Sequence, residues 1–214
     1  MGVKMIYEPM TLITDMILGL VALYFGLKIS DFYWRSFQIF HSNLSYTFYF
    51  LALSAILGGV FHGFGPHFSE VLRNFLWRGT VISIGISSFF FLLAALVLTT
   101  PLKTYLVIRW IPIFATLFYV IIIWNNPNFS NVGKFYLPAM VLIFILIIYT
   151  YFFLGQSGAG NMIIGLMIMF FGAVVWKSGF SLHTHFNHND IYHVIITVAI
   201  WYLYRGGLVL KDFS

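Results

Sequence analysis

Residues 183–193 read His-Thr-His-Phe-Asn-His-Asn-Asp-Ile-Tyr-His, and a long apolar run begins immediately after them. This stretch shows the pattern that the chain repeats, a short polar loop followed by an apolar segment. A helix that crosses the hydrocarbon core of a bilayer, about 30 Å thick, needs about 20 apolar residues. The stretch therefore predicts a membrane-spanning helix with an unusual concentration of imidazoles at one membrane surface.

Composition supports the same class of protein. Of 214 residues, 61% are hydrophobic and only 8% are charged, which excludes a water-soluble globular domain. The net charge of +5 is spread over single positions without a polybasic run, so we expect no nucleic-acid partner. The absence of cysteine excludes disulfides and thiolate zinc sites. We therefore predict an integral, multi-pass membrane protein.

Apolar segments of spanning length recur seven times, joined by short turns rich in Gly, Pro and Asn. This indicates an all-α membrane protein, a seven-transmembrane-helix bundle forming a single domain over residues 1–214. The predicted spans are 9–29, 41–63, 78–99, 104–124, 135–154, 160–178 and 190–209.

Seven crossings place the amino terminus and every second loop on one side of the membrane. Lysines and arginines divide five against six between the two sides, so the positive-inside rule gives no orientation. The histidines divide unequally, because all except His41 fall on the amino-terminal side. We therefore expect residues distant in sequence to meet at one membrane level, as a site between helices requires.

The strongest candidates are His62, at the end of the second segment, and His193, at the start of the seventh. Neutral imidazole and carboxylate groups are common zinc ligands. Asp190 lies three residues before His193 and shares its helix face. We predict a zinc site with His62 and His193 as ligands, completed by His188 or Asp190. The alternative is that Asn189 or Asp190 caps the helix and the histidines are interfacial hydrogen-bonding residues.

Asp15 lies about two turns inside the first segment, where a carboxylate is costly unless it is paired, protonated or metal-bound. Two readings remain open: an ion pair with Arg78, or support of a metal-bound histidine. Asp190 and Asp15 are also our candidate proton acceptors in catalysis. By contrast, we expect His183 and His185 to be solvated loop residues.

Two short motifs resemble the CREST superfamily, which includes alkaline ceramidases and progestin/adiponectin receptors. They are Phe61-His62 and the aromatic-His-aliphatic sequence 191–195, Ile-Tyr-His-Val-Ile. The resemblance implies a zinc ion held by His62 and His193, with a Ser and an Asp assisting. The chain departs from the family at Asn189, where a histidine is expected, and at Gly58, where a serine is expected; its third segment has no Asp.

These observations lead to a predicted function and two alternatives. We expect a zinc-dependent intramembrane hydrolase that acts on a lipid amide or ester, with the bilayer and a lipid substrate as partners. The first alternative is a non-catalytic membrane sensor, receptor or complex subunit. The second is bis-histidine haem ligation through His62 and His193. A retinal pigment is disfavoured because residues 191–204 contain no lysine.

Overall fold

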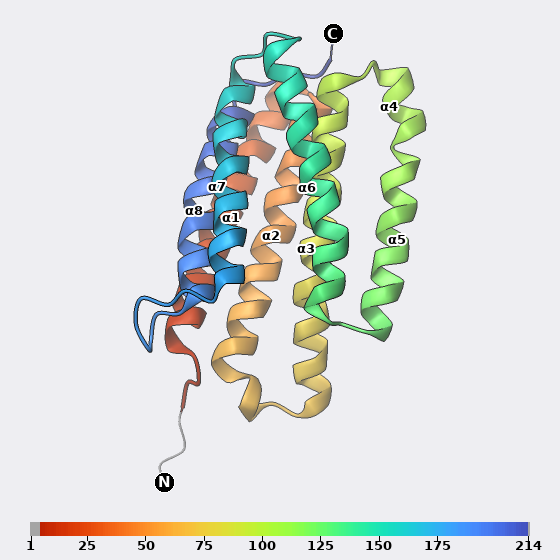
Figure 1. Cartoon of the computed structure of the whole chain (residues 1–214). Coiled ribbons are helices and arrows are strands. Elements are labelled where there is room, and N and C mark those ends of the chain that lie inside the picture. The colour runs from red at the N-terminus through yellow and green to blue at the C-terminus, as the bar shows by residue number, and fades with distance from the viewer. Residues whose placement is uncertain (1–4, 214) are drawn as a thin grey trace.

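The computed structural model describes residues 5–213, and these residues are helical without any named strand. Figure 1 shows long helices running between two ends, which we call the lower end, where the amino terminus lies, and the upper end. The elements are α1 Pro9–Ser36, α2 Ile39–Phe64, the short 3₁₀ helix η1 Gly65–His67, α3 Glu70–Thr99, α4 Leu102–Ile108, α5 Trp110–Asn125, α6 Phe129–Phe152, α7 Gly158–Ser178 and α8 His188–Gly207.

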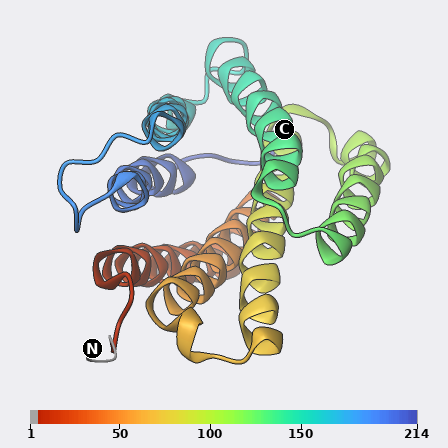
Figure 2. The ribbon, with the colours of Figure 1, turned by 60° about the horizontal axis from the view of Figure 1, so that its bottom comes forward.

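Helices α1, α2, α3, α6, α7 and α8 pack in that order, and α8 returns to α1, so together they close a ring. Figure 2, viewed toward the lower end, shows this arrangement, with α5 outside the ring against α3. The closure between α8 and α1 brings the first and last helices of the chain side by side. It therefore places the start of α8 beside the first turns of α1.

Six of the seven predicted spans each correspond to one helix, and several of these helices are longer than predicted. α1 continues to Ser36 because its last turns leave the apolar region, where Asp31 and Arg35 form an i,i+4 ion pair at 2.7 Å. α3 begins at Glu70 because Ser69 caps it, accepting a hydrogen bond from the Leu72 N–H. The segment 104–124 is divided into α4 and α5 at Arg109.

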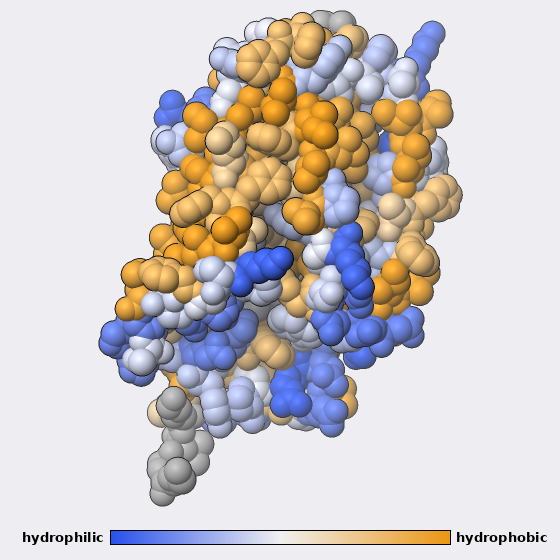
Figure 3. Space-filling view, viewed as in Figure 1, coloured by the Kyte–Doolittle hydropathy of each residue, from blue (hydrophilic) through white to orange (hydrophobic). Residues whose placement is uncertain are grey.

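Six helical segments of the described chain are long and apolar enough to cross a membrane: α1, α2, α3, α4–α5, α6 and α7. Figure 3 shows a broad band of apolar side chains over this face, with hydrophilic side chains gathered at the lower end. α8 has 20 residues but carries Asp190, His193 and Arg205, which lower its mean hydropathy. An all-helical, multi-pass organisation is thus supported, and α8 is the one predicted span that the length and composition of its helix leave undecided.

Glycine lets α1 and α2 approach closely at the lower end. A Cβ on Gly59 would lie 2.9 Å from the Cβ of Asp15, closer than side chains tolerate. A Cβ on the neighbouring Gly58 would lie 3.6 Å from Oδ2 of Asp15. The two glycines therefore make room for an acidic side chain between the helices.

The upper half of the ring is filled by a continuous apolar core. Phe25 of α1 stacks on Tyr204 of α8 with ring centroids 4.4 Å apart, and Leu44, Ile143 and Ile200 are fully buried nearby in the same cluster. The carboxyl-terminal segment then crosses this end: the Phe213 N–H donates to the Val97 carbonyl of α3 at 3.0 Å. The upper end of the ring is closed.

Candidate functional site

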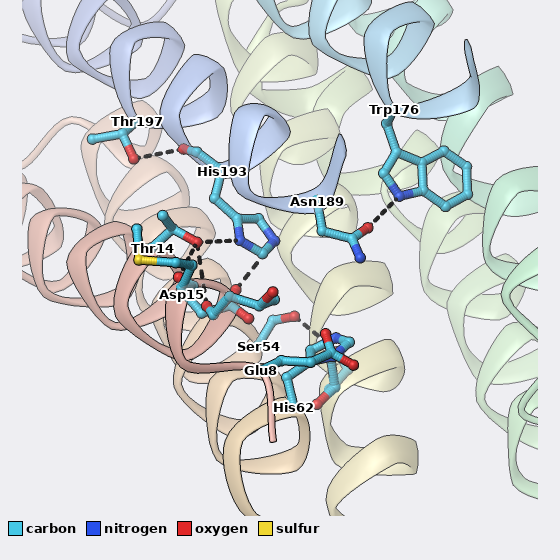
Figure 4. A network of polar contacts seen from close by, with 12 residues as sticks. Glu8, Thr14, Asp15, Ser54, His62, Trp176, Asn189, His193 and Thr197 are labelled. Atoms are coloured by element: carbon cyan, nitrogen blue, oxygen red, sulfur yellow. Dashed lines mark hydrogen bonds and ion pairs between the residues drawn. The ribbon is translucent and has the colours of Figure 1, made fainter. Parts of the chain in front are cut away.

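Asp15 faces inward from α1 and is paired with His193 of α8. Its Oδ1 lies 3.3 Å from Nε2 of His193, and the two side chains are only 6% and 14% exposed. The other ring nitrogen, Nδ1, lies 3.1 Å from the Thr14 hydroxyl. Both nitrogens of one imidazole thus contact adjacent residues of α1, which fixes the orientation of the ring (Figure 4).

A second carboxylate–imidazole pair lies at the same end of the ring. Oε2 of Glu8, the residue before α1, is 3.1 Å from Nδ1 of His62 in the last turns of α2. These side chains are 47% and 24% exposed, so this pair lies nearer the edge than Asp15 and His193. We call Glu8, Asp15, His62 and His193 the acid–imidazole cluster.

The members of the cluster influence one another electrostatically. The carboxylates of Glu8 and Asp190 lie close enough to Asp15 to repel its negative charge, and the two imidazoles are within electrostatic range of each other. Figure 4 shows the residues converging from α1, α2 and α8. The predicted meeting of His62 and His193 at one level is supported, but each ring is paired with its own carboxylate.

Asp190 takes part in capping α8, in line with the alternative raised from the sequence, but as the third helical residue and not as the N-cap. The N-cap is Asn187, neither Asn189 nor Asp190 as expected, and it forms a capping box with Asp190. Oδ2 of Asp190 accepts from the Asn187 N–H at 2.7 Å. Its Oδ1 is buried and has no hydrogen-bond partner among residues 5–213. Asn189 points to α7, where its Oδ1 accepts from the Trp176 indole N–H at 2.9 Å.

His188 is the first residue of α8, inside the helix rather than before its cap. Its ring lies beside Trp176, with centroids 6.5 Å apart. The structure therefore does not bring His188 together with His62 and His193. His183 and His185 are exposed, as predicted, in a loop where His183 and Phe186 form an isolated bridge.

The first of the two readings of Asp15, an ion pair with Arg78, is wrong. The Arg78 guanidinium lies over the ring of Trp124, 5.7 Å from its centroid, and its Nε has no hydrogen-bond partner within residues 5–213. Asp15 instead finds its partner on α8, because ring closure brings that helix against α1.

Two hydroxyls behind the cluster differ in their acceptors. Thr80 bonds within its own helix, donating to the Leu76 carbonyl at 2.9 Å. Ser54 instead donates across to the Thr80 carbonyl of α3 at 3.0 Å, which joins α2 to α3 behind the cluster.

The donor chemistry suits zinc, but the arrangement does not. Across residues 5–213, no group of three or more His, Asp or Glu side chains is placed to hold a metal ion. Both nitrogens of His193 contact α1 side chains, so a metal would have to displace Asp15 or Thr14. The predicted zinc ion stays a prediction, and we derive no chemical step from it.

Sequence reasoning passed over Glu8 and Thr14 as members of the site. Glu8 lies seven residues before Asp15, which is the spacing of one helix face, so periodicity could have linked them. Thr14 gave no comparable signal, because a hydroxyl within a membrane helix ordinarily bonds its own backbone. Its role follows only from the way α8 packs on α1.

The fold and the cluster define a class: an all-helical protein with several helices able to cross a membrane and a polar centre at one end of a helix ring. The chain belongs to the family described as "Family of unknown function (DUF6962)", whose match covers residues 10–212. No curated protein and no solved structure matches the chain. The resemblance to the CREST superfamily stays a prediction.

Proposed function

We propose that this chain is a seven-span membrane hydrolase that cleaves an amide or ester bond of a lipid, with the acid–imidazole cluster as its reaction centre. α8 is the seventh span in this proposal. Its 20 residues correspond to about 30 Å of helix, enough for the hydrocarbon core. It packs between α7 and α1 as a full member of the ring, which supports this placement.

The Asp15–His193 pair carries the proposal. Removing a carboxylate and an imidazole from water costs several kcal/mol unless they are well paired. An apolar pair would join α1 to α8 without that cost, so helix packing alone does not account for these residues. Ionisable groups within membrane segments ordinarily mark a functional site. Two such pairs at one level strengthen this inference.

The two pairs differ in exposure, which suggests different roles. His62 is the more accessible imidazole, and with Glu8 on Nδ1 it is suited to take a proton from water as the oxygen attacks the carbonyl carbon. The enclosed Asp15–His193 pair would give a proton to the leaving nitrogen or oxygen as its bond to the carbonyl carbon breaks. One proton is accepted and one is donated, so the cluster returns to its starting charge after the two pairs exchange a proton.

The substrate class follows from the position of the cluster. The polar centre lies at the lower end, next to the broad apolar band of the outer surface, which suits a molecule that has both a polar group and an acyl chain. Two aromatic contacts join α6 to α7, Phe144 with Phe170 at 5.5 Å and Phe129 with Trp176 at 5.0 Å. Figure 3 shows the surface hollowed between these helices, and we propose that the lipid approaches the cluster from this side.

The test is release of fatty acid from a mixed lipid extract by the purified protein in lipid nanodiscs. We expect wild type to release fatty acid and the His62→Ala, His193→Gln double variant to release none. His185→Ala is the matched control, because it removes an exposed imidazole at the same end of the molecule. Elemental analysis of the same samples tests zinc directly: near-stoichiometric zinc that the double variant loses would establish a metal site in place of the metal-free scheme.

A non-catalytic sensor is the second candidate, and one observation favours it. His193 contacts α1 through both ring nitrogens, so a single imidazole links α8 to α1 at the lower end. A folded wild-type protein that releases no fatty acid from any lipid class, yet changes its α1–α8 distance when a ligand binds, would favour this candidate over the hydrolase.

A further inference from the structure

A cavity of about 560 Å³ lies at the upper end of the ring, between the carboxyl-terminal segment and the loop that joins α6 to α7 (Figure 1). We call it the upper cavity, and it is lined by Gln38, residues 154–157, Val209 and residues 211–213. Small-molecule sites in proteins have volumes of roughly 300–1,000 Å³, so this cavity is large enough for a ligand. The acid–imidazole cluster lies at the other end of the ring, so the upper cavity is a separate feature.

Two of the polar side chains that line the upper cavity are already used by the fold. Gln156 bonds the backbone of Lys211 twice: its Nε2 donates to the carbonyl at 3.1 Å, and its Oε1 accepts from the N–H at 3.0 Å. Both oxygens of Asp212 accept from backbone N–H groups of α2 at 2.8 Å. The Asp212 carboxylate is therefore occupied, and the ammonium group of Lys211 has no ion-pair partner within residues 5–213.

The polar side-chain groups that remain available in the upper cavity are hydrogen-bond donors. Oε1 of Gln38 accepts from the Asp212 N–H at 2.7 Å, which leaves the amide Nε2 to donate. Ser157 forms no side-chain capping bond at the start of α7, so its hydroxyl is also available. Free donors at a surface are common, but here three line one cavity, because Lys211 adds its ammonium group. Such a set suits an anion whose oxygens accept hydrogen bonds.

The charge of the upper end favours the same kind of ligand. Within residues 5–213, six cationic side chains lie at this end: Lys28, Arg35, Lys103, Arg109, Arg205 and Lys211. Two carboxylate side chains of the described chain lie there, Asp31 and Asp212, which leaves an excess of four positive charges. Asp31 is already paired with Arg35 at 2.7 Å. The field of this end therefore attracts anions.

A second hollow adjoins the upper cavity along the carboxyl-terminal segment. Its volume is about 280 Å³, and it shares Gln38, Val209 and Lys211 with the upper cavity. Its two further polar side chains, Ser36 and His41, contact each other at 3.1 Å, and the remaining side chains of its lining are apolar. Free donors thus lie beside an apolar surface, which suits a phosphate group attached to an apolar molecule.

We propose that the upper cavity binds a phosphate group, which the Lys211 ammonium attracts by its charge and to which the Gln38 amide and the Ser157 hydroxyl donate hydrogen bonds. The group belongs either to an anionic phospholipid or to free phosphate, since the two offer the same oxygens. A bound phosphate would join the turn between α1 and α2, the α6–α7 loop and the carboxyl-terminal segment, so binding would stabilise the upper end. This inference does not depend on the proposed hydrolase.

The experiment measures binding to delipidated protein in a neutral detergent. The probe is dioctanoyl phosphatidylglycerol, and the comparison probe is dioctanoylglycerol, which has the same acyl chains and no phosphate. We expect phosphatidylglycerol to bind about tenfold more tightly than dioctanoylglycerol and to raise Tm, because it binds only the folded state. Inorganic phosphate is then added as a competitor. Displacement of the lipid at equal concentration identifies free phosphate as the ligand, and retention of the lipid identifies the phospholipid.

Lys211→Gln tests the assignment, because it removes the charge and keeps the backbone bonds to Gln156. We expect about a tenfold loss of affinity for phosphatidylglycerol, and about a threefold loss for Ser157→Ala, which removes an uncharged donor. Lys103→Gln is the matched control, because this exposed lysine lies at the same end outside the cavity, and its affinity should equal that of wild type. An equal loss in the two lysine variants, or equal binding of the two probes by wild type, would overturn the proposal.

Discussion

The two ends of the helix ring each bury polar side chains, but they satisfy them differently. At the upper end, Asp212 accepts from the backbone N–H groups of Ile39 and Phe40 through its two oxygens, both at 2.8 Å. His41 contacts the Gly207 carbonyl at 2.9 Å and the Ser36 hydroxyl at 3.1 Å.

At the lower end, carboxylates contact imidazoles, and one oxygen of Asp190 has no partner within the described chain. Polar groups that satisfy backbone atoms replace hydrogen bonds that the fold would otherwise lack, so they stabilise it. Side chains that are paired only with one another satisfy no backbone atom, so they do not stabilise the fold in this way. On the proposed function, the polar groups of the upper end hold the fold together and those of the lower end carry out the chemistry.

Among the variants that test the difference between the two ends, Asp15→Asn is expected to have the largest effect. The amide keeps the size of the side chain and can still contact His193, but it cannot hold the negative charge or exchange a proton. We expect lipid hydrolysis to fall by about 100-fold or more, with Tm changed little. The measurement is the rate of fatty-acid release in nanodiscs beside the melting temperature. Wild-type activity in this variant would remove Asp15 from the reaction centre.

The opposite result is expected at the upper end for Asp212→Ala. Two charge-assisted hydrogen bonds to the first turn of α2 are lost together. Each contributes roughly 1.5 kcal/mol, so we expect a stability loss of about 3 kcal/mol and a clear fall in Tm. The specific activity of the fraction that remains folded should match wild type. A selective loss of activity would contradict the division between the two ends.

Thr14→Val tests whether the Thr14 hydroxyl orients the ring of His193 at the lower end. Valine has nearly the same shape as threonine, but it removes the hydroxyl that contacts Nδ1 of His193. The ring then loses one of its two fixed contacts, and we expect about a tenfold fall in kcat with KM nearly unchanged. Steady-state kinetics with the identified lipid measure this. A change confined to KM would mean that Thr14 contacts substrate instead of orienting the imidazole.

The smallest effect is expected for His185→Ala, which removes an exposed imidazole from the loop before α8. Stability should change by less than about 0.5 kcal/mol, and fatty-acid release should equal that of wild type. Melting curves and release assays measure both. A large loss of activity would extend the functional site into the loop and weaken the assignment of chemistry to the enclosed pairs.

Much of the fold follows from hydropathy, because a bilayer-spanning helix requires a long apolar segment and the chain offers clear ones. The convergence of histidines at one end follows from counting crossings. The order of packing does not: nothing in the local sequence places α8 against α1 with α5 outside the ring.

The errors at the site arise because the local sequence does not give the order in which the helices pack. The pairing of Asp15 with Arg78 was plausible by membrane level alone, and only ring closure shows that His193 takes this place. The position of the α8 cap was missed by two to three residues, since Asn187, Asn189 and Asp190 are all favourable capping residues and tertiary contacts decide among them.

The carboxyl-terminal segment makes the upper end of the ring different from the lower end. It lies across the upper end, tied to α2 through Asp212 and to α3 through Phe213, above an interior already filled by apolar side chains. The carboxyl-terminal segment therefore makes the two ends of the ring unequal, and the acid–imidazole cluster lies at the end that this segment does not cross.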